Sequence, residues 1–430
     1  MSKSEAILNW REEAVFDDSI KEYEYMEYTP ITGTQLNSSG DIRITVESQD
    51  MYSHPSESYL LVSGRLTKED GSAYTNADVV TLTNNGIMHL FDSVRYDLGG
   101  KEIETLRYPG QTMTMLKALT ISDDQCRTEG LNALWAKDGG ATASLTANTG
   151  FTERHGWIII SPQEKGRFQV QIPLKEIFGF CEDYTKVIYG LKQVLTLKRK
   201  ADTDAIFKAA AADDGKVTLD KVSWFLPIVD PNDEEKFALK KQIEDKTELS
   251  IDYRMRQADN IAVPPSSSFD WRLTVKAGAE KPRYVIVAFQ TGKENNQEQN
   301  PSIFDHCNVQ SMTVYLNNIQ YPRTDYDLDI SQNQFARLFG DLSKFRANYT
   351  GVTAELAQCN ISPSEWKTLY PFYVFDVTKQ SERLKTTTID MKIKVRFSQN
   401  VPANTQAYAL VLSDRKILMQ SNGNNFNVVY

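Results

Sequence analysis

The segment Ile389-Asp-Met-Lys-Ile-Lys-Val-Arg-Phe397 alternates apolar and polar side chains without a break. In a β-strand, successive side chains point to opposite faces, so the apolar residues of this segment share one face and the charged residues share the other. A strand that is buried on one face and solvated on the other is typical of an antiparallel sheet that packs on a core. The segment therefore predicts an all-β fold built from antiparallel sandwiches.

The same alternation recurs earlier in the chain. Ile42–Val46 and Phe168–Ile172 repeat it over shorter lengths. Other runs are apolar on both faces, as central strands are, namely 157–160, 222–229, 284–289 and 408–412. The predicted strands are short and are separated by Gly, Pro, Asn and Asp, which indicates a sandwich or a barrel.

Length and composition point to a folded protein of more than one domain. The chain has 430 residues, of which 40% are hydrophobic and 24% are charged. That composition is ordinary for a globular protein and too apolar for a disordered one. At roughly 100 to 200 residues per domain, two domains are the simplest expectation.

The second half of the chain repeats features of the first half in the same order. Pro55-Ser-Glu-Ser-Tyr59 leads into a predicted strand, and Pro265-Ser-Ser-Ser-Phe269 does so 210 residues later. A hairpin turning at Gly99-Gly100 and ending in Tyr108-Pro109 corresponds to one turning at Asn317-Asn318 and ending in Tyr321-Pro322. These dipeptides supply the positive φ that a tight hairpin turn needs. The repetition predicts a duplicated sandwich.

Further features follow these hairpins in both halves. Each hairpin precedes a helical pattern, with Met115, Ala118 and Leu119 on one face in the first half, and with Phe335, Leu338, Phe339 and Leu342 at helical spacing in the second. Next, the strand 168–172 corresponds to 372–374, and 189–197 corresponds to 389–397 at an offset of 200. The offset changes only by lengths that loop insertions explain.

The spacing of these features divides the chain into four parts. Residues 1–40 are polar, acidic and tyrosine-rich, and we expect an N-terminal arm or a first edge element there. The sandwiches are expected at 41–230 and 247–430. A linker helix is expected within 231–246, with Asn232 or Asp233 as its N-cap and with Phe237 and Ile243 as buried anchors.

Three irregular stretches fit loops that project from a sandwich, and long loops on a rigid scaffold usually carry contacts. They lie near 123–153, 201–215 and 292–300.

The net charge of −9 disfavours direct nucleic-acid binding, because an acidic surface repels phosphates. A basic run of Lys192, Lys198, Arg199 and Lys200 is the one local exception, and a solvated strand end explains it equally well. The first residues contain neither a signal-peptide h-region nor a basic arm, and no later stretch has the length of a membrane span. We expect a protein that is neither exported by a signal peptide nor membrane-spanning.

No motif for catalysis or for a cofactor is apparent, so we expect no catalytic, cofactor-binding or metal-binding residues. Catalytic and metal-binding histidines normally cluster with other ligands. The histidines here are scattered, and the cysteines form no CxxC pair, so the cysteines read as reduced core residues. These residues are His54, His89, His155, His306, Cys126, Cys181, Cys307 and Cys359.

Two further kinds of motif are incomplete. Gly99-Gly100-Lys101 and Gly292-Lys293 lack the upstream glycine and the following Ser or Thr of a phosphate-binding loop, and they read as turns. The pairs Asp202/Asp204 and Asp325/Asp327 lack the glycine and terminal glutamate of a calcium loop and read as solvated acidic residues.

Two similar sandwich halves, a short linking helix and a helix after a matching hairpin in each half resemble the double jelly-roll major capsid proteins. The resemblance covers about residues 40–430, and the sequence looks closest to the Polinton (Maverick), adintovirus and virophage type of that lineage, which includes adenovirus hexon. It implies an all-β fold of two tandem eight-stranded antiparallel jelly rolls with short helices in the loops, and no enzymatic activity.

The resemblance also implies a specific assembly. Three copies would form a pseudo-hexameric capsomer, and such capsomers would tile an icosahedral virion shell together with penton and minor capsid proteins. A closed trimer suits the sequence because it covers edge strands that would otherwise aggregate. By the same analogy, the loops after each hairpin would form outward towers, while the arm and the C-terminal 426–430 would touch neighbouring capsomers. The protein would be made and assembled inside the host cell.

The alternatives are a double jelly-roll enzyme that processes glycans and a glycan-binding module without catalysis. The enzyme would need paired carboxylates and aromatic side chains in the cleft between the halves. Isolated tryptophans in or near strands are more often core residues. The available ones are Trp135, Trp157, Trp224, Trp271 and Trp366.

Overall fold

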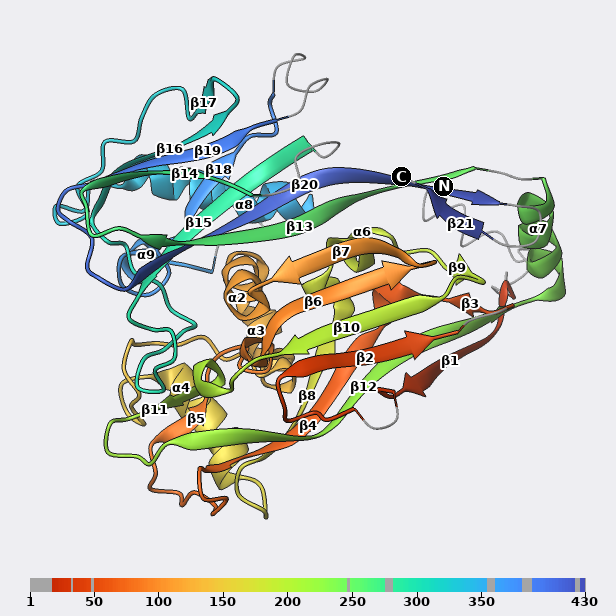
Figure 1. Ribbon diagram of the computed structural model, residues 1–430, viewed down its shortest axis with the longest axis horizontal. Coiled ribbons are helices and arrows are strands. Elements are labelled where there is room, and N and C mark those ends of the chain that lie inside the picture. The colour runs from red at the N-terminus through yellow and green to blue at the C-terminus, as the bar shows by residue number, and fades with distance from the viewer. Residues whose placement is uncertain are drawn as a thin grey trace, which may run out of the picture.

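The computed structural model describes residues 18–31, 34–47, 50–245, 248–274, 281–353, 360–380, 389–421 and 426–429. Most of them lie in two β-sandwiches packed side by side (Figure 1). Helix α7, Asp233–Glu244, joins the last strand of the first sandwich to the first strand of the second.

The first sandwich consists of two antiparallel sheets. One sheet has the order β1-β12-β4-β8, and the other has the order β2-β10-β6-β7. Short strands β3, Tyr52–Ser53, and β9, Ile188–Tyr189, extend the first sheet, while β5, Val80–Leu82, and β11, Ile206–Lys208, form a separate ribbon. The main strands are β1 Ile20–Tyr28, β2 Gly40–Val46, β4 Tyr59–Lys68, β6 Phe91–Leu98, β7 Lys101–Arg107, β8 Arg167–Pro173, β10 Gln193–Arg199 and β12 Gly215–Pro231.

The second sandwich has the sheet orders β13-β20-β15-β18 and β14-β19-β16-β17. Strand β21, Phe426–Val429, pairs with the last residues of β20. The main strands are β13 Leu249–Val263, β14 Ser268–Arg272, β15 Lys281–Thr291, β16 Val309–Leu316, β17 Ile319–Tyr321, β18 Tyr373–Asp376, β19 Met391–Phe397 and β20 Thr405–Ser421.

Both sandwiches arrange their main strands identically. When the eight strands of each sandwich are counted along the chain, one sheet has the order 1-8-3-6 and the other has 2-7-4-5. This is the order of an eight-stranded jelly roll. The expected fold class of two tandem antiparallel jelly rolls is confirmed.

The matching topology tests each step of the repeat seen in the sequence. The two hairpins are the equivalent pairs β6–β7 and β16–β17, and the later matches fall on β8 with β18 and on β10 with β19. The Pro-Ser match is wrong, because Pro55 precedes the third strand of its jelly roll whereas Pro265 precedes the second. A proline-serine turn can begin any strand, so this signal does not fix a position in the fold.

One-sided burial follows the alternation of the sequence. In β19 the side chains of Ile393 and Val395 are buried against the core, whereas Lys394 and Arg396 are exposed. Fully burying one such aliphatic side chain is worth roughly 1.5 to 3 kcal/mol, which is why a one-residue change of register is disfavoured.

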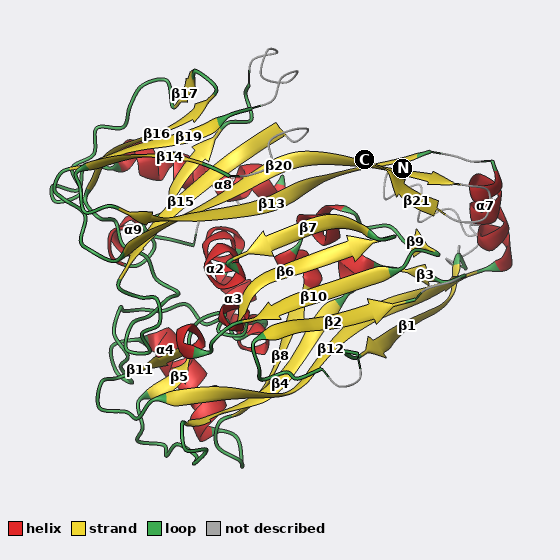
Figure 2. Ribbon diagram, in the orientation of Figure 1, coloured by secondary structure: helices red, strands yellow, loops and turns green. Residues whose placement is uncertain are grey.

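The helices are short and lie in loops, several of them near the boundary between the jelly rolls (Figure 2). Helices α2 and α8 follow the equivalent hairpins as expected, and α2 contacts both β6 of its own jelly roll and β20 of the other. The bounds are α2 Pro109–Thr120, α3 Asp123–Thr128, α4 Thr149–His155, α5 Leu174–Ile177, α6 Gly179–Asp183, α8 Ala336–Thr350 and α9 Pro363–Thr368.

The structure corrects two expectations about local structure. The apolar run Trp157–Ile160 is not a strand but a π-helical turn, Gly156–Ile160, that continues from α4. Asn148 caps α4 by accepting from the Phe151 amide, and the helical direction then carries on through the run. In α7, Ile243 is buried as expected, but Phe237 is 74% exposed because only one side of this helix meets the fold.

The predicted irregular loops are more structured than expected. The stretch 123–153 contains α3, most of α4 and the buried Trp135. The stretches 201–215 and 292–300 bond to each other, since the Gln297 side chain donates to the Gly215 carbonyl and accepts from the Gly215 amide. Both contacts join the first jelly roll to the second.

The segment expected to be an N-terminal arm or first edge element contains β1, which pairs with β12 over eight residue pairs. Residues 1–17 lie outside the described part of the chain. The start of β1, helix α7 and the end of β20 lie at one end of the molecule (Figure 1), because the Asn232 amide donates to the Ser19 carbonyl and Ser421 Oγ donates to the Ile243 carbonyl.

Candidate functional site

A buried polar junction joins the two jelly rolls along the edge of β13. The Glu104 carboxylate of β7 accepts from the amides of Arg256 at 2.8 Å, Phe180 at 3.1 Å and Gly179 at 3.2 Å. Asp183 of α6 accepts from the Arg254 amide at 2.7 Å. Unpaired backbone amides at a buried strand edge would be costly, so these two carboxylates satisfy the edge that β20 leaves open.

Two arginines of β13 complete this junction. Arg254 forms an ion pair with Asp183 at 2.5 Å, and its guanidinium lies 4.1 Å from the centre of the Tyr349 ring. Arg256 is 3% exposed and forms an ion pair with Glu182 at 2.6 Å. It also donates to the main-chain carbonyls of α5. Charge-assisted bonds at buried sites are strong and directional, so they fix the orientation of β13 against the first jelly roll.

Burial shifts the pKa values of two ionisable groups in the junction. It raises the pKa of Glu104 to about 7, although Arg256 and the three amides favour the ionised form. Because the folded state holds this proton more tightly than the unfolded chain does, this group favours folding at low pH, and its contribution declines as the pH rises from about 4.5 to 7. Burial also raises the pKa of the neighbouring Cys181 thiol, which is therefore unreactive.

Gly179 allows α6 to touch β13 directly. A Cβ atom at this position would lie 1.7 Å from the Arg254 carbonyl oxygen, which is far inside van der Waals contact. A residue without a side chain is therefore needed where the two jelly rolls meet.

A second buried cluster connects the loops at the opposite end from α7. Arg154 and Asp138 form an ion pair at 2.8 Å with both side chains fully buried. Asp138 also accepts from Asn300 of the second jelly roll at 2.9 Å, and Ser302 donates to the Asn84 carbonyl at 2.7 Å. The two clusters hold the jelly rolls together at two separate places.

The sequence singled out none of these residues. Arg254 and Arg256 were hidden within a segment that reads as an ordinary alternating strand. The available signal was a pair of arginines on one face of a strand, which indicates a polar contact only once the opposing carboxylates are known to be close.

The four histidines lie apart. His54 contacts Tyr23 and the Thr185 carbonyl, His155 contacts the Val80 carbonyl, and His306 accepts from the Asn308 amide. His89 is fully buried without a hydrogen-bond partner, and this burial lowers its pKa to about 3. Within the described ranges, no group of three His, Cys, Asp or Glu residues could hold a metal ion.

The basic run is paired within the chain. Lys192 pairs with Glu47, Lys198 with Asp92 at 3.0 Å and Lys200 with Asp204 at 2.9 Å, while Arg199 is 6% exposed. Neutralised or buried cations form no phosphate-binding patch.

The remaining candidates serve structure. Gly99 and Gly100 have positive φ and form the β6–β7 turn, and Gly292 also has positive φ. Asp202 accepts from the Val217 amide, and Asp325 accepts from Gln320. Cys181 is buried, Cys126 and Cys307 are partly buried, and all three are free thiols. Cys359 lies outside the described residues.

A groove of about 950 Å³ lies between the sheet β2-β10-β6-β7 and the edge of β13. Several carboxylates line it, but Asp97 and Glu102 pair with Arg95, and Asp92 pairs with Lys198. Its one aromatic lining residue is Tyr108. Four of the candidate tryptophans are buried in the core and Trp157 is exposed outside the groove, so the groove offers no aromatic platform for a glycan.

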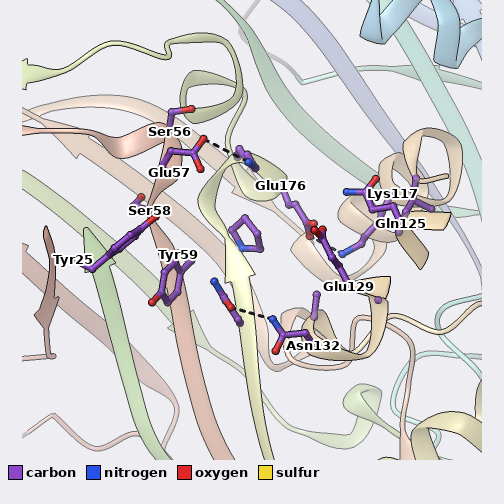
Figure 3. A pocket seen from close by; sticks show the side chains of 16 residues that line it. Tyr25, Ser56, Glu57, Ser58, Tyr59, Lys117, Gln125, Glu129, Asn132 and Glu176 are labelled. Atoms are coloured by element: carbon purple, nitrogen blue, oxygen red, sulfur yellow. Dashed lines mark hydrogen bonds and ion pairs between the residues drawn. The ribbon is translucent and has the colours of Figure 1, made fainter. Parts of the chain in front are cut away.

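A smaller cavity of about 300 Å³ lies on the outer side of β4 and β8 (Figure 3). Tyr25 and Tyr59 lie on one side of it, and Lys117 of α2 lies on the other. The cavity carries mixed charge, because Lys117 pairs with Glu176 at 2.7 Å and Lys175 lies 3.7 Å from Glu57.

Comparisons with known proteins agree with this architecture. The model of the double jelly roll-like domain family matches residues 141–417. The Sputnik virophage structure is similar over 100% of this chain and 92% of that chain, with a TM-score of 0.62 and 9% identity. The mavirus major capsid protein is similar over 98% of this chain and 92% of that chain, with a TM-score of 0.53 and 11% identity.

The Faustovirus major capsid protein is also similar, with a TM-score of 0.55 and 8% identity over 97% of this chain and 94% of that chain. At these identities the likeness is one of fold. No curated protein matches the sequence.

Two eight-stranded jelly rolls joined by buried polar clusters define a protein of the double jelly-roll class. The family model covers more than half of the sequence. The chain therefore belongs to the double jelly roll-like domain family.

The helices in the described part of the chain lack the length and hydrophobicity that a membrane span requires.

Proposed function

We propose that this protein is a viral major capsid protein that forms trimeric, pseudo-hexameric capsomers tiling an icosahedral shell. The observation that carries the proposal is the duplication itself, because two jelly rolls of identical strand order are held side by side in one chain by buried polar clusters. Three such chains around a three-fold axis present six similar jelly rolls, and six-sided units can tile a surface. The shared fold of the virophage, mavirus and Faustovirus structures supports the proposal.

The proposal includes the partners and the location. The partners are two further copies of the chain, neighbouring capsomers, and penton and minor capsid proteins, and the location is the virion shell assembled inside the host cell. Sequence-specific nucleic-acid binding is not part of this function, since the net charge is −9 and the basic run is paired or buried.

We divided the chain into an arm at 1–40, a first jelly roll at 41–230, a linker helix at 231–246 and a second jelly roll at 247–430. The proposed organisation keeps these divisions, except that the first jelly roll begins within the segment 1–40. Strand β1 is the first strand of the first jelly roll, because it pairs with β12 in the position that β13 takes beside β20. The expected arm is then limited to residues that precede β1.

Light scattering coupled to size-exclusion chromatography, followed by electron microscopy, tests the assembly. We expect a species of three times the chain mass of 48.8 kDa, with a six-sided outline viewed along its axis. A protein that stays monomeric at every concentration and forms no shell would contradict the proposal.

A further inference from the structure

A stripe of aromatic rings, exposed on β1 and half-buried on β4 and β12, crosses one face of the first jelly roll. It consists of Tyr23 and Tyr25 of β1, Tyr59 of β4 and Phe225 of β12, and we call it the tyrosine face. Neighbouring ring centres are 6.0 Å apart for Tyr23 and Tyr25, 5.5 Å for Tyr25 and Tyr59, and 5.1 Å for Tyr59 and Phe225. Tyr23 is 39% exposed and Tyr25 is 46% exposed.

The tyrosine face points away from the core of its own jelly roll. The alternate residues on the same strands, Leu60 and Trp224, are buried, and Trp224 packs on Tyr96 of the opposite sheet. Tyr25 and Tyr59 therefore occupy the outer side of the sheet, where they border the 300 Å³ cavity (Figure 3). Tyrosine is enriched in the centres of protein interfaces because its ring buries a large area at low entropic cost.

The equivalent outer face of the second jelly roll is covered. Strands β1 and β13 are both first strands that pair with the eighth strand of their jelly roll. On the β13 side, Arg256 is 3% exposed against α5 and α6, and Tyr408 is 3% exposed with its ring 5.9 Å from that of Tyr108. The first jelly roll supplies this cover, including helix α2.

The outer edges of β13 and β1 also differ in their hydrogen bonding to the rest of the chain. The amides of Arg254 and Arg256 on the outer edge of β13 donate to Asp183 and Glu104 of the first jelly roll. No hydrogen bond links the outer edge of β1 to any other described residue. A strand edge that no described residue of its own chain pairs is a place where another chain can add or pack.

We propose that the tyrosine face and the outer edge of β1 bind the second jelly roll of a second copy of this chain. The contact between jelly rolls inside one chain is then repeated between chains. Helix α8 of the second copy takes the place of α2, because both helices follow the fifth strand of their jelly roll. This inference rests on the proposed capsid function and names the surface through which the trimer closes.

The substitution Tyr25→Lys tests the surface. It places a charge at the centre of the tyrosine face without touching the core, so the monomer should keep its unfolding midpoint. We expect at least about ten-fold more protein to be needed for half-assembly, the size expected for the loss of an interface hot spot. The matched control is Phe237→Lys, which changes an exposed aromatic residue on α7 and should assemble like the wild type.

Two further measurements identify which surface of the second copy contacts the tyrosine face. In a mixture of isotopically labelled and unlabelled chains, cross-linking should join Lys21 or Lys175 of one chain to Lys344 of the other. Hydrogen exchange at the amides of β1 should slow when the wild-type protein assembles, but not in the Tyr25→Lys variant at the same concentration.

The outcomes separate this inference from the proposed function. A wild-type protein that never assembles contradicts the proposed function. Trimers that form equally well with Tyr25→Lys, or cross-links from Lys21 and Lys175 that avoid Lys344, would overturn the assignment of this surface while leaving the capsid proposal standing.

Discussion

Gly179 shows how a single residue sets the spacing of the two jelly rolls. Its missing side chain lets the first turn of α6 lie directly on the Arg254 carbonyl, and Glu104 then reaches the amides on both sides of the contact. The close approach and the carboxylate bonds depend on each other, because a wider gap would leave buried amides without acceptors.

Gly179→Ala should therefore destabilise the protein. The new methyl group would meet the Arg254 carbonyl oxygen at 1.7 Å, and overpacking of this kind costs typically about 1 to 3 kcal/mol. Urea unfolding followed by tryptophan fluorescence measures the change. Gly340→Ala in α8 is the control, because no atom lies within 4 Å of its added Cβ and alanine favours a helix by up to about 1 kcal/mol. Equal stability of the two variants would contradict the role of Gly179.

The buried His89 leads to a prediction about how the stability of the protein depends on pH. Burial lowers its pKa from 6.5 to about 3, with a smaller contribution from Lys200. Between these pH values the unfolded chain binds a proton that the folded chain does not, so the contribution of His89 to stability should fall as the pH drops below 6.5, opposite in sign to that of Glu104. Since one pKa unit corresponds to 1.36 kcal/mol, this loss reaches about 3 kcal/mol by pH 4.

His89→Leu should remove that part of the acid sensitivity. Neither ring nitrogen of His89 has a hydrogen-bond partner, so an apolar side chain of similar size leaves no buried group unsatisfied. Urea midpoints of both proteins, measured from pH 7 to pH 4, provide the comparison. Parallel curves for the wild type and the variant would show that His89 is not the titrating group.

At the scale of elements, β13 differs most from what its sequence suggests. It is the first strand of the second jelly roll, yet its outer edge is completed by carboxylates of the first. Its pattern of alternating burial predicts a strand, but the partner of its edge is about 70 to 150 residues away in the chain. Equivalent strand β1 has no such cover among the described residues, so equal strand order does not give equal surroundings.

Arg256→Leu tests the coupling through β13. The change removes the cation that favours the ionised form of the buried Glu104 and that pairs with the partly exposed Glu182. Breaking a buried pair costs typically about 3 to 5 kcal/mol, and we expect a loss at the lower end of that range because Glu182 keeps Arg254 at 3.7 Å. Guanidinium unfolding should show this loss. Arg167→Leu is the control, because its pairs with Glu164 and Asp220 are exposed and should matter far less. A comparable loss in both variants would argue against a special role for the junction.

At the scale of the whole molecule, the chain combines an internal pair of jelly rolls with exposed apolar groups. Among the described residues, seven of the nine large exposed hydrophobic side chains belong to the first jelly roll or its flanking segments, whereas the second contributes Val352 and the linker contributes Phe237. Such asymmetry is expected when one jelly roll of each chain meets the other jelly roll of the next, because the two faces of a heterologous contact need not be alike.

The sequence by itself determined the fold class, the hairpins, the helices that follow them and the order of the later strands. These features depend on local chemistry, since alternation at Ile393 and Val395 and turn residues such as Gly99 act within a few residues of themselves. The match of Pro55 with Pro265 failed because turn signals are local and do not record which strand they precede.

Only the tertiary structure decided how the two jelly rolls meet. The pairing of Arg256 with Glu182 and the contact of Gly179 with Arg254 join residues that are separated by 70 or more positions, and nothing in a local pattern specifies them. The exposure of Tyr25 and Phe237 was also undetermined, because a sequence shows that a side chain is apolar but not whether its own chain or another copy covers it.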